Sequence, residues 1–583
     1  AGRKDKRMSA SLQGSSEATD ASLIHSLRAI LGARHVLTTP SATYRFRKGF
    51  RFGMGDVVAV LQPGSLVELW RAAKLCAESG RIIIMQAANT GLTGGSTPDG
   101  NDYDRGVVII STNRLDGIHL IGEGRQVVCL PGSTLHDLED KLAAIGREPH
   151  SVIGSSCIGA SVLGGVSNNS GGALVQRGPA FTEMALFGQM GADGKLHLVN
   201  HLGIRLEGNP EEILAAVQAG QLPEAAIDWN AGRGHDENYA THVRDVDADT
   251  PARFNADPNR WYEAAGCAGK LVVFAVRLDT FEANKNPAVF YIGTNSTSDL
   301  EDLRRYALTH FDELPIAGEY LHRDAFDIAE KYGKDTFAVI RYFGTKYLPK
   351  FFSMKSRFDV FAQKLPFLSD HFSDLAMQVL SRFLPKQLPK RMCEYRDRFE
   401  HHLMLKVSAP MTAPVRTYLE QWASSTGGAF FECTPEEGKL AFLHRFAAAG
   451  AAVRYRAIHT KTAEDIVALD VALRRNDREW FEVLPKEIED KIIVKLYYGH
   501  FFCHVMHQDY VIKKGYNAMQ VEHDMLPGLD ARGARYPAEH NVGHLYKAPD
   551  EMVAHYRSLD PCNCFNPGIG LATKTRNWVA ESV

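Results

Sequence analysis

The 583-residue sequence contains no apolar run of the ~18 residues that a membrane-spanning helix needs. Its basic and polar start, AGRKDKRMSASLQGSSEATD, also lacks the apolar centre of a signal peptide. Net charge is small, because 66 basic residues face 69 acidic ones and leave a formal charge of −3. We therefore expect a chain that neither crosses a bilayer nor is secreted by this route, and whose affinity for any polyanion must come from a local patch.

Cysteine is sparse and irregular, with nine residues and no CxxC pair. This usage indicates reduced thiols, and Cys562 with Cys564 alone provides too few ligands for a zinc site. The composition, 45% hydrophobic and 23% charged, excludes disorder, a collagen-like helix and a coiled-coil rod. The length allows several domains, at roughly 100–200 residues each.

Two runs of small residues stand out, although neither matches GxGxxG or GxxxxGK[ST]. The first, QAANTGLTGGSTPDG (86–100), follows the strand-like RIIIM, and the second is HSVIGSSCIGASVLGGVSNNSGG (150–172). Small residues let backbone amides approach an anion such as a pyrophosphate. A single glycine-rich turn is as often structural, but two in one domain predict an extended ligand lying along the backbone.

Helix and strand patterns alternate from about residue 22 to 200, as in SLVELWRAAKLCAESG (65–80) followed by RIIIMQA (81–87). Such alternation is typical of an α+β or α/β domain. The stretch 200–262 is polar and rich in Asp, which predicts a long surface excursion. Strand patterns return at 269–282 and again at 491–514.

A basic and aromatic segment lies between Lys331 and Arg398, where fourteen Lys/Arg face six Asp/Glu and thirteen of 68 residues are Phe or Tyr. A solvated face of a folded domain, a nucleic-acid site and an attachment to an anionic membrane surface are the three interpretations. No nucleic-acid-binding module accompanies the segment. Membrane attachment is favoured, because each Lys or Arg contributes ~1 kcal/mol near such a surface and aromatic rings settle at the interface. The densest parts are 348–358 and 381–392.

Three histidines lie in YYGHFFCHVMHQDY. On a helix, His500, His504 and His507 would share a face and could bind a metal. The β-branched and aromatic flanks favour a strand instead, which would put His500 and His504 on one face and His507 on the other.

The order of AANTGLTGGSTP, GASVLGGVSNNSGG and NPGIG resembles the FAD-binding domain shared by vanillyl-alcohol oxidase and its relatives. PSATYRFRKGFRFGMGDVVAV, REPHSVIGSSCIGASV and YPAEHNVGHLYKAP more closely resemble the respiratory, quinone-dependent D-lactate dehydrogenase family of bacteria. The match runs from about residue 30 to 578. It implies a peripheral flavoenzyme that oxidises D-lactate to pyruvate and reduces a membrane quinone. A positively charged domain would hold it on anionic phospholipid at the cytoplasmic face of the inner membrane.

The resemblance also implies which residues contact FAD. These are Ala87, Ala88, Asn89, Thr90, Gly91, Gly95 and Ser96 in the first loop, Gly154, Ser161 and Gly171 in the second, and Val273. The small residues of the two loops suit this role, whereas the sequence alone would assign Val273 to the core. Some relatives tether the flavin through a His in the first loop. Because 86–96 contains no His, we expect FAD to be bound non-covalently.

The segment PAEHNVGHLY places Glu539, His540 and His544 in a turn-rich loop similar to the EHG-type loop of FAD-linked 2-hydroxyacid dehydrogenases. There a His near the flavin takes the hydroxyl proton, which requires a group whose pKa is near the working pH. The catalytic residues expected are His540 and Glu539, with His504 next; structural hydrogen bonding and metal ligation are the alternatives for His540. Asn541 follows His540 where the pattern has Gly, and no metal ligand is assigned.

The substrate carboxylate needs a cation, best an Arg, and the candidates are Arg445, Arg454 and Arg456. We expect an α+β flavoprotein of three parts. They are an FAD-binding domain (1–279 with 531–583), an antiparallel-sheet cap (280–321 with 399–436 and 461–530) and a basic membrane-binding insert (322–398 with 437–460). The alternatives are a soluble FAD-linked 2-hydroxyacid dehydrogenase with another electron acceptor, and a flavin-free membrane scaffold.

Overall fold

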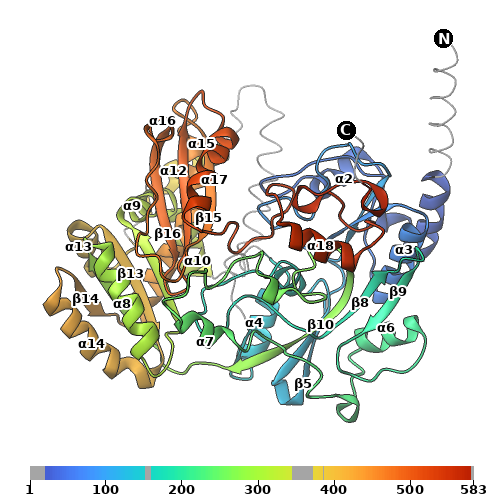
Figure 1. The fold of residues 1–583 in the computed structure, drawn as a ribbon, viewed down its shortest axis with the longest axis horizontal. Coiled ribbons are helices and arrows are strands. Elements are labelled where there is room, and N and C mark those ends of the chain that lie inside the picture. The colour runs from blue at the N-terminus through green and yellow to red at the C-terminus, as the bar shows by residue number, and fades with distance from the viewer. Residues whose placement is uncertain (1–19, 151–158, 344–371, 382, 385–386, 580–583) are drawn as a thin grey trace.

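The computed structural model describes residues 20–150, 159–343, 372–381, 383–384 and 387–579. Three β-sheets and their covering helices form two bodies, which stand side by side in Figure 1. The amino-terminal part of the chain forms most of the right-hand body. The carboxyl-terminal segment, drawn in red, packs with it. The mixture of helices with parallel and antiparallel sheets confirms the predicted α+β class.

The first sheet has four strands in the order β1 (Val36–Leu37), β2 (Ala59–Leu61), β4 (Val107–Ser111) and β3 (Ile82–Gln86). Strands β2, β4 and β3 are parallel, and their near-continuous Val/Ile runs are buried as parallel strands require. Helices α2 (Pro40–Arg47) and α3 (Leu66–Glu78) connect them. Since the first small-residue loop begins where β3 ends, it lies at the carboxyl edge of a parallel sheet, where ligands of such sheets bind.

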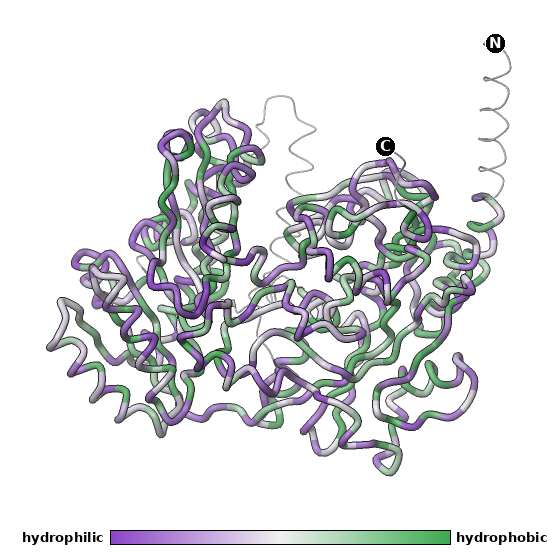
Figure 2. Tube along the Cα trace, in the orientation of Figure 1, coloured by the Kyte–Doolittle hydropathy of each residue, from purple (hydrophilic) through white to green (hydrophobic). Residues whose placement is uncertain are grey.

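The second sheet is antiparallel and is built around the long strand β10 (Val272–Glu282). Its other strands are β5 (Ile118–Ile121), β6 (Gln126–Cys129), β7 (Arg147–Pro149), β8 (Ala185–Met190) and β9 (Leu196–Asn200). Helices α4 (Leu135–Ala143) and α5 (Val162–Ser167) pack with this sheet in one core. The apolar stretches in Figure 2 follow these strands.

The polar stretch 200–262 is not the solvated excursion that its composition predicts. It contains α6 (Pro210–Gln218) and α7 (Tyr239–Arg244), and it buries Tyr239 and Arg253 almost completely. Its buried charged side chains are paired, as in the ion pair of Arg260 with Asp236 at 2.6 Å and that of Arg253 with Glu539. Pairing removes the cost of burying a charge, which composition alone cannot reveal.

The third sheet, the cap sheet, is fully antiparallel. Its order is β14 (Ala429–Glu432), β11 (Ala288–Thr294), β13 (His401–Val407), β12 (Ala317–His322), β16 (Ile492–His500), β17 (Val505–Lys513) and β15 (Ala463–Ala472). Helices α8 (Thr297–His310), α14 (Thr412–Ser425) and α17 (Ala518–Ala531) pack on one face. Helices α9 (Arg323–Tyr332), α13 (Lys390–Arg398) and α15 (Pro435–Ile458) pack on the other.

Two further helices of the basic segment, α10 (Lys334–Phe343) and α12 (Phe372–Ser381), pack against α15. No helix in the described part of the chain is long and apolar enough to span a bilayer. Helix α18 (Asp550–Leu559) and the residues after it return to the first sheet, where Ile83 N–H donates to the Cys564 carbonyl at 3.0 Å. The division into three parts stays a prediction; β10 continues three residues past its boundary at 279.

The core between the cap sheet and α9 contains a histidine, His402, whose side chain is fully buried. The rings of Phe326 and Tyr291 lie 5.5 and 5.8 Å from the His402 ring. Burial and the neighbouring His401 lower the pKa of His402 to about 3. His402 therefore stays neutral in the folded protein at pH values where an unfolded His takes up a proton.

We predict that this core loses stability as the pH falls from about 6.5 towards 3, because only the unfolded state gains a proton there. Each pH unit in this range lowers the free energy of unfolding by up to about 1.4 kcal/mol for one such histidine. His402→Phe should make the fall in urea midpoint between pH 7 and pH 5 smaller, whereas His523→Phe, at an exposed histidine, should not. An unchanged slope in His402→Phe would show that His402 is charged in the folded state.

Candidate active site

A row of polar side chains lies on the face of the cap sheet that α9 and α15 cover. Strand pairing sets Glu319 opposite His500, Tyr498 opposite His507, and Asp470 opposite His507. Side chains of directly paired residues point to the same face. The result is a continuous polar patch on four strands, in which His500 Nδ1 lies 2.6 Å from Glu319 Oε1.

The histidine segment is a hairpin and not a single strand, so the predicted faces are wrong. Strand β16 ends at His500 and β17 begins at Val505, with a turn between them. The turn reverses the chain, which brings His500 and His507 together and leaves His504 in the turn. The turn residues 501–504 include no Gly, Asn or Pro, and His504 itself adopts a left-handed φ of 58°.

Glu539 approaches this patch from the carboxyl-terminal segment as a buried carboxylate. Its oxygens lie 3.1 Å from His500 Nε2 and 3.4 Å from His507 Nε2, and it forms an ion pair with Arg253. Burial alone would raise the pKa of Glu539, but His500 and Arg253 hold it well below the ordinary value. Burial would lower the pKa of His500, which Glu319 and Glu539 instead raise. The cluster therefore holds alternating fixed charges.

His540 lies beside this cluster and is more open to solvent. Its side chain is 33% exposed, and its Nε2 is 3.7 Å from Asp470 Oδ2. The same carboxylate oxygen accepts a hydrogen bond from the backbone N–H of Glu539 at 2.7 Å. Asp470 therefore both holds the loop of Glu539 and His540 and faces the His540 imidazole. A carboxylate so placed can stabilise an imidazolium when His540 takes up a proton.

The first small-residue loop leaves its backbone accessible. Gln86 Nε2 donates to the Ser96 carbonyl at 2.7 Å, and Ser96 Oγ donates to Asn89 Oδ1 at 3.0 Å, so the loop is folded back on itself. Gly91 is exposed, and a Cβ at this position would meet nothing within 4 Å. All seven predicted contact residues lie on this loop, half-buried or exposed: Ala87, Ala88, Asn89, Thr90, Gly91, Gly95 and Ser96.

The carboxyl-terminal segment holds this loop in place. Thr93 Oγ1 donates to the Asn541 carbonyl at 2.8 Å, and His544 N–H donates to the Thr93 carbonyl at 3.0 Å. Gly543 has a φ of +59°, and a Cβ there would lie 2.1 Å from the Thr93 carbonyl oxygen. Asn541, which departs from the EHG pattern, contacts the first loop through its main-chain carbonyl, while its side-chain Oδ1 accepts from Gly543 N–H at 2.8 Å.

The second loop meets the same cluster from the other side. A Cβ on Gly171 would lie 2.8 Å from both Arg253 and Glu539, and Arg253 donates to the Gly172 carbonyl at 2.7 Å. The Ser161 hydroxyl caps α5 by accepting from Gly164 N–H at 2.9 Å. Gly154 lies outside the described residues. The Val273 side chain is buried in the core of the second sheet, which leaves only its backbone for a ligand.

Of the three predicted arginines, Arg445 alone lies at the cluster, with Nη2 3.0 Å from Glu319 Oε2. Arg454 pairs with Asp335 and Asp374 in the basic segment, and Arg456 with Asp465 on the far end of α15.

Sequence reasoning missed two arginines. Arg253 lies in the polar stretch, where no motif distinguishes it. Arg51 is exposed in the loop after α2, and its charge opposes the burial that raises the pKa of Asp509. Asp509 accepts a hydrogen bond from Tyr498 at 2.8 Å, so Arg51 lies near the polar patch. The segment RFRKGFRFG contains four basic residues, and nothing in it distinguishes Arg51 from the other three.

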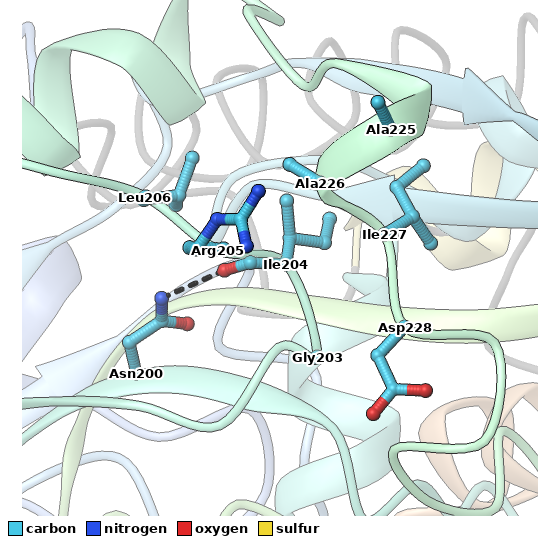
Figure 3. A pocket seen from close by; sticks show the side chains of 9 residues that line it. All are labelled: Asn200, Gly203, Ile204, Arg205, Leu206, Ala225, Ala226, Ile227 and Asp228. Carbon is cyan, nitrogen blue, oxygen red and sulfur yellow. Dashed lines mark hydrogen bonds between the residues drawn. The ribbon is translucent and has the colours of Figure 1, made fainter.

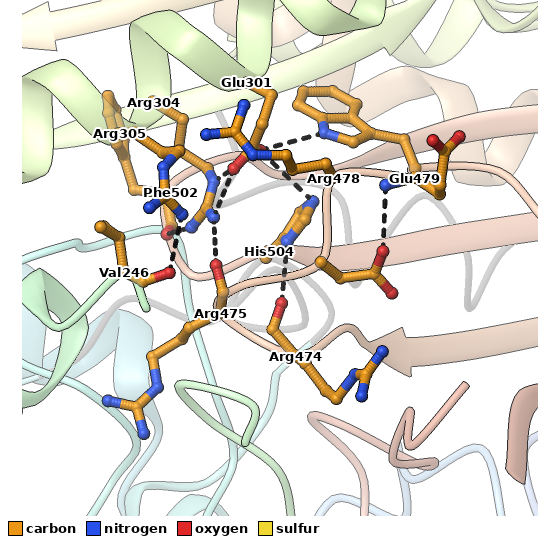
Figure 4. Close-up of polar contacts among 12 residues, drawn as sticks. Val246, Glu301, Arg304, Arg305, Arg474, Arg475, Arg478, Glu479, Phe502 and His504 are labelled. Atoms are coloured by element: carbon orange, nitrogen blue, oxygen red, sulfur yellow. Dashed lines mark hydrogen bonds and ion pairs between the residues drawn. The ribbon is translucent and has the colours of Figure 1, made fainter. Parts of the chain in front are cut away.

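The structure does not bring His504 into the cluster (Figure 4). Its ring is buried on the opposite side of the sheet, 5.5 Å from the Trp480 ring and with Nε2 4.0 Å from Glu301. Burial and the Arg304 guanidinium lower its pKa well below the ordinary value. His504 is thus a neutral, buried imidazole whose Nδ1 contacts the Arg474 carbonyl at 3.3 Å, and it packs the hairpin turn against the core.

His500, His507 and Glu539 could also hold a metal ion, since one ligand atom from each lies within 4.8 Å of the others. Two imidazoles and a carboxylate suit a transition-metal ion. Such an ion requires neutral imidazoles and would replace the proton that Glu319 and Glu539 hold on His500. Between the Glu319 and Glu539 carboxylates, the cluster can therefore hold either a protonated His500 or a metal ion.

A cavity of about 480 Å³ lies elsewhere, between residues 200–206 and 225–228 (Figure 3). Asn200 Nδ2 donates to the Ile204 carbonyl at 2.9 Å across it. None of the predicted site residues lines this cavity.

Two family models match the chain. One, described as an FAD binding domain, covers residues 57–197, and the other, described as D-lactate dehydrogenase, membrane binding, covers residues 289–578. A quinone-dependent D-lactate dehydrogenase of Haemophilus influenzae is 59% identical over 557 residues, which is 95% of this chain and 99% of that protein. One of Escherichia coli is 57% identical over 95% of this chain and 97% of that protein.

Solved structures share the fold at low identity. p-Cresol methylhydroxylase with substrate bound matches with a TM-score of 0.59 at 11% identity, over 95% of this chain and 97% of that one. Alkyldihydroxyacetonephosphate synthase matches with a TM-score of 0.56 at 10% identity, over 94% and 84%. These neighbours confirm the predicted fold of the vanillyl-alcohol oxidase type, and the first family model confirms FAD as the cofactor.

We predict that Gly91→Val weakens FAD binding at least ten-fold, because the protein leaves space there that only a bound ligand would fill. Gly427→Val is the matched control, since a Cβ at Gly427 also meets nothing within 4 Å and no flavin loop is near it. The ratio of flavin to protein absorbance after gel filtration measures the result. Retention of stoichiometric FAD by Gly91→Val would remove this loop from the binding site.

Proposed function

Since the chain belongs to the family of quinone-dependent D-lactate dehydrogenases, we propose that His540 is the base that takes the hydroxyl proton of D-lactate. The protein is a peripheral membrane flavoenzyme that oxidises D-lactate to pyruvate and passes the electrons to a quinone. The alternative of a soluble 2-hydroxyacid dehydrogenase is not favoured, because the membrane-binding family model covers residues 289–578. The FAD-binding family model likewise disfavours a flavin-free scaffold.

The observation that carries the proposal is the pairing of a solvent-accessible imidazole with a fixed carboxylate where the two loops and the cap sheet meet. A general base must reach the substrate and exchange its proton with water. His500 is committed between two carboxylates, and His504 and His544 are buried. His540 satisfies both requirements, and Asp470 stabilises the charge that it gains.

Oxidation of D-lactate removes the hydroxyl proton and a hydride from the same carbon, and bound FAD supplies the hydride acceptor. The residues that would hold FAD are those of the two loops, whose open glycine positions and half-buried backbone fit an extended dinucleotide. Glu539 and Asp470 hold the His540 loop beside these two loops. Non-covalent binding stays the prediction for this cofactor.

We further propose that Arg51 binds the substrate carboxylate. Among the described residues, Arg253 is paired with Glu539 and Arg445 with Glu319, whereas Arg51 forms no ion pair. A guanidinium that is exposed and close to Tyr498 and Asp509 can take up a carboxylate without breaking an existing pair.

For the membrane, we propose attachment to anionic phospholipid at the cytoplasmic face of the inner membrane. The local excess of eight positive charges between Lys331 and Arg398 supports it. Apolar side chains of α12 and the residues after it are exposed there, with Leu380 at 66% and Phe383 at 83%. The dense part 348–358 lies entirely outside the described residues. Cations and exposed apolar groups together favour a charged lipid surface.

We predict that His540→Ala lowers the rate of FAD reduction by D-lactate about 10²–10⁴-fold while FAD stays bound. Asp470→Asn should lower the same rate by a smaller factor, because it removes only the stabilisation of the imidazolium. His523→Ala, at an exposed histidine on α17, is the control. Anaerobic stopped flow measures the rate, and a wild-type rate in His540→Ala would assign the base to another residue.

We predict that charge reversal at Lys350, Lys355, Lys386 and Lys390 releases the protein from anionic vesicles. Lys390 is exposed, with its Nζ 3.5 Å from Glu394, and the other three lie outside the described residues. Wild-type binding should also weaken in 1 M salt, where the Debye length falls to about 3 Å. Sedimentation with vesicles of anionic and of neutral lipid tests this; FAD reduction by D-lactate is the control. Equal binding to both lipids would contradict the electrostatic proposal.

A further inference from the structure

A second enclosed space lies within the helices of the basic segment. Helices α9, α10, α12 and α15 surround a cavity of about 430 Å³. Its walls combine the apolar and aromatic residues Ala329, Tyr332, Phe337, Leu388 and Ile458 with polar and charged ones. This volume is within the range of small-molecule sites, about 300–1,000 Å³, and it exceeds what one aromatic ring needs.

Polar side-chain atoms on the wall of this cavity have no hydrogen-bond partner among the described residues. They are both the amide nitrogen and oxygen of Gln387, the Oε1 atom of Gln378 and the Nε2 atom of His444. All three residues are at least nine-tenths buried. An unpartnered buried amide or imidazole costs about 1–3 kcal/mol, so a ligand that satisfies these atoms would gain that energy.

His444 is neutral at physiological pH, because burial lowers its pKa to about 3. Its ring also interacts with the backbone of Phe326, which leaves Nε2 free to accept a hydrogen bond. The cavity thus has one amide donor, on Gln387, and three acceptors, on Gln387, Gln378 and His444. None of these unpartnered atoms belongs to a carboxylate, whose negative charge would oppose the electron-rich carbonyl oxygens of a quinone.

We propose that this cavity binds the ring of the electron acceptor, a substituted 1,4-benzoquinone or naphthoquinone. The proposal rests on the function given above and adds a location for its second substrate. The Gln387 amide N–H can donate to a quinone carbonyl, and Gln378 Oε1 and His444 Nε2 can accept from the hydroxyl groups of the quinol. The two electrons and two protons that D-lactate loses on becoming pyruvate equal those that the quinone takes up on becoming quinol.

The cavity is connected to the active-site cluster through α15. His444 lines the cavity, and the next residue of the helix, Arg445, contacts Glu319. Glu319 in turn bonds His500, which lies 3.1 Å from Glu539. Ser381, at the end of α12, lines the cavity, and its neighbours Leu380 and Phe383 are exposed, so an apolar quinone could enter from the lipid surface.

The experiment compares Gln387→Leu with Gln421→Leu, a similar change at an exposed position of α14. Replacing an unpartnered buried amide by Leu should leave the fold stable. Each holoenzyme is assayed with D-lactate and either a short-chain ubiquinone analogue or ferricyanide, which takes electrons without a ring-binding site. We expect Gln387→Leu to raise the KM for the quinone at least ten-fold. Its rate with ferricyanide and its binding to anionic vesicles should match those of the control.

An unchanged quinone KM in Gln387→Leu, or an equal loss with both acceptors, would overturn the proposal. A second measurement uses the wild-type holoenzyme and a photoreactive azidoquinone in vesicles. Labelled peptides from 329–337, 378–388 or 444–459 are expected, and labelling only of the FAD loops or of lipid would contradict the site. Failure of D-lactate to reduce the bound flavin would instead contradict the proposed function, and stopped flow without any quinone separates the two cases.

Discussion

The buried carboxylate of Glu539 is the constraint on which the arrangement of the site depends. It is 7% exposed, and its compensation comes from segments far apart in sequence: Arg253 from the polar stretch, and His500 and His507 from the cap hairpin. Removing one partner of a buried ion pair typically costs about 3–5 kcal/mol. The two bodies in Figure 1 are therefore joined at the candidate active site by the contacts of Glu539.

The two small-residue loops meet this carboxylate without side chains of their own. Gly171 is close to Arg253 and Glu539, and Gly543 lies against the Thr93 carbonyl, so both contacts exclude even a methyl group. The absence of side chains serves two purposes at once. It lets a dinucleotide approach the backbone, and it lets the loops approach the residues that act on the substrate.

The cap sheet separates two kinds of core. One face packs on α8, α14 and α17 and is apolar, whereas the other carries the polar row and then the aromatic core under α9 and α15. Helix α15 takes part in both the active-site cluster, through Arg445, and the proposed quinone site, through His444. One rigid helix of 24 residues thus joins the place where electrons enter to the place where we propose that they leave.

The sequence by itself determined the α+β class, the two glycine-rich loops and, through long matching motifs, the family and FAD. Local patterns suffice for these features, because strand runs and loops of small residues are formed by consecutive residues. The loop of Glu539 and His540 was also identified, and the structure places both beside the cap sheet.

Only the tertiary structure decided which charges meet. Arg253 and Asp470 lie in segments without a motif, no feature of PSATYRFRKGFRFGMGDVVAV distinguishes Arg51 from its other basic residues, and the turn after His500 has no Gly, Asn or Pro to mark it. The sequence therefore put His504 with the wrong partners and ranked Arg454 and Arg456 beside Arg445. Burial and ion pairing depend on contacts between residues hundreds of positions apart, such as the 286 positions between Arg253 and Glu539. Periodicity and composition describe only residues close together in the chain. Contacts between distant residues form only when the sheets pack, so they could not be predicted from these patterns.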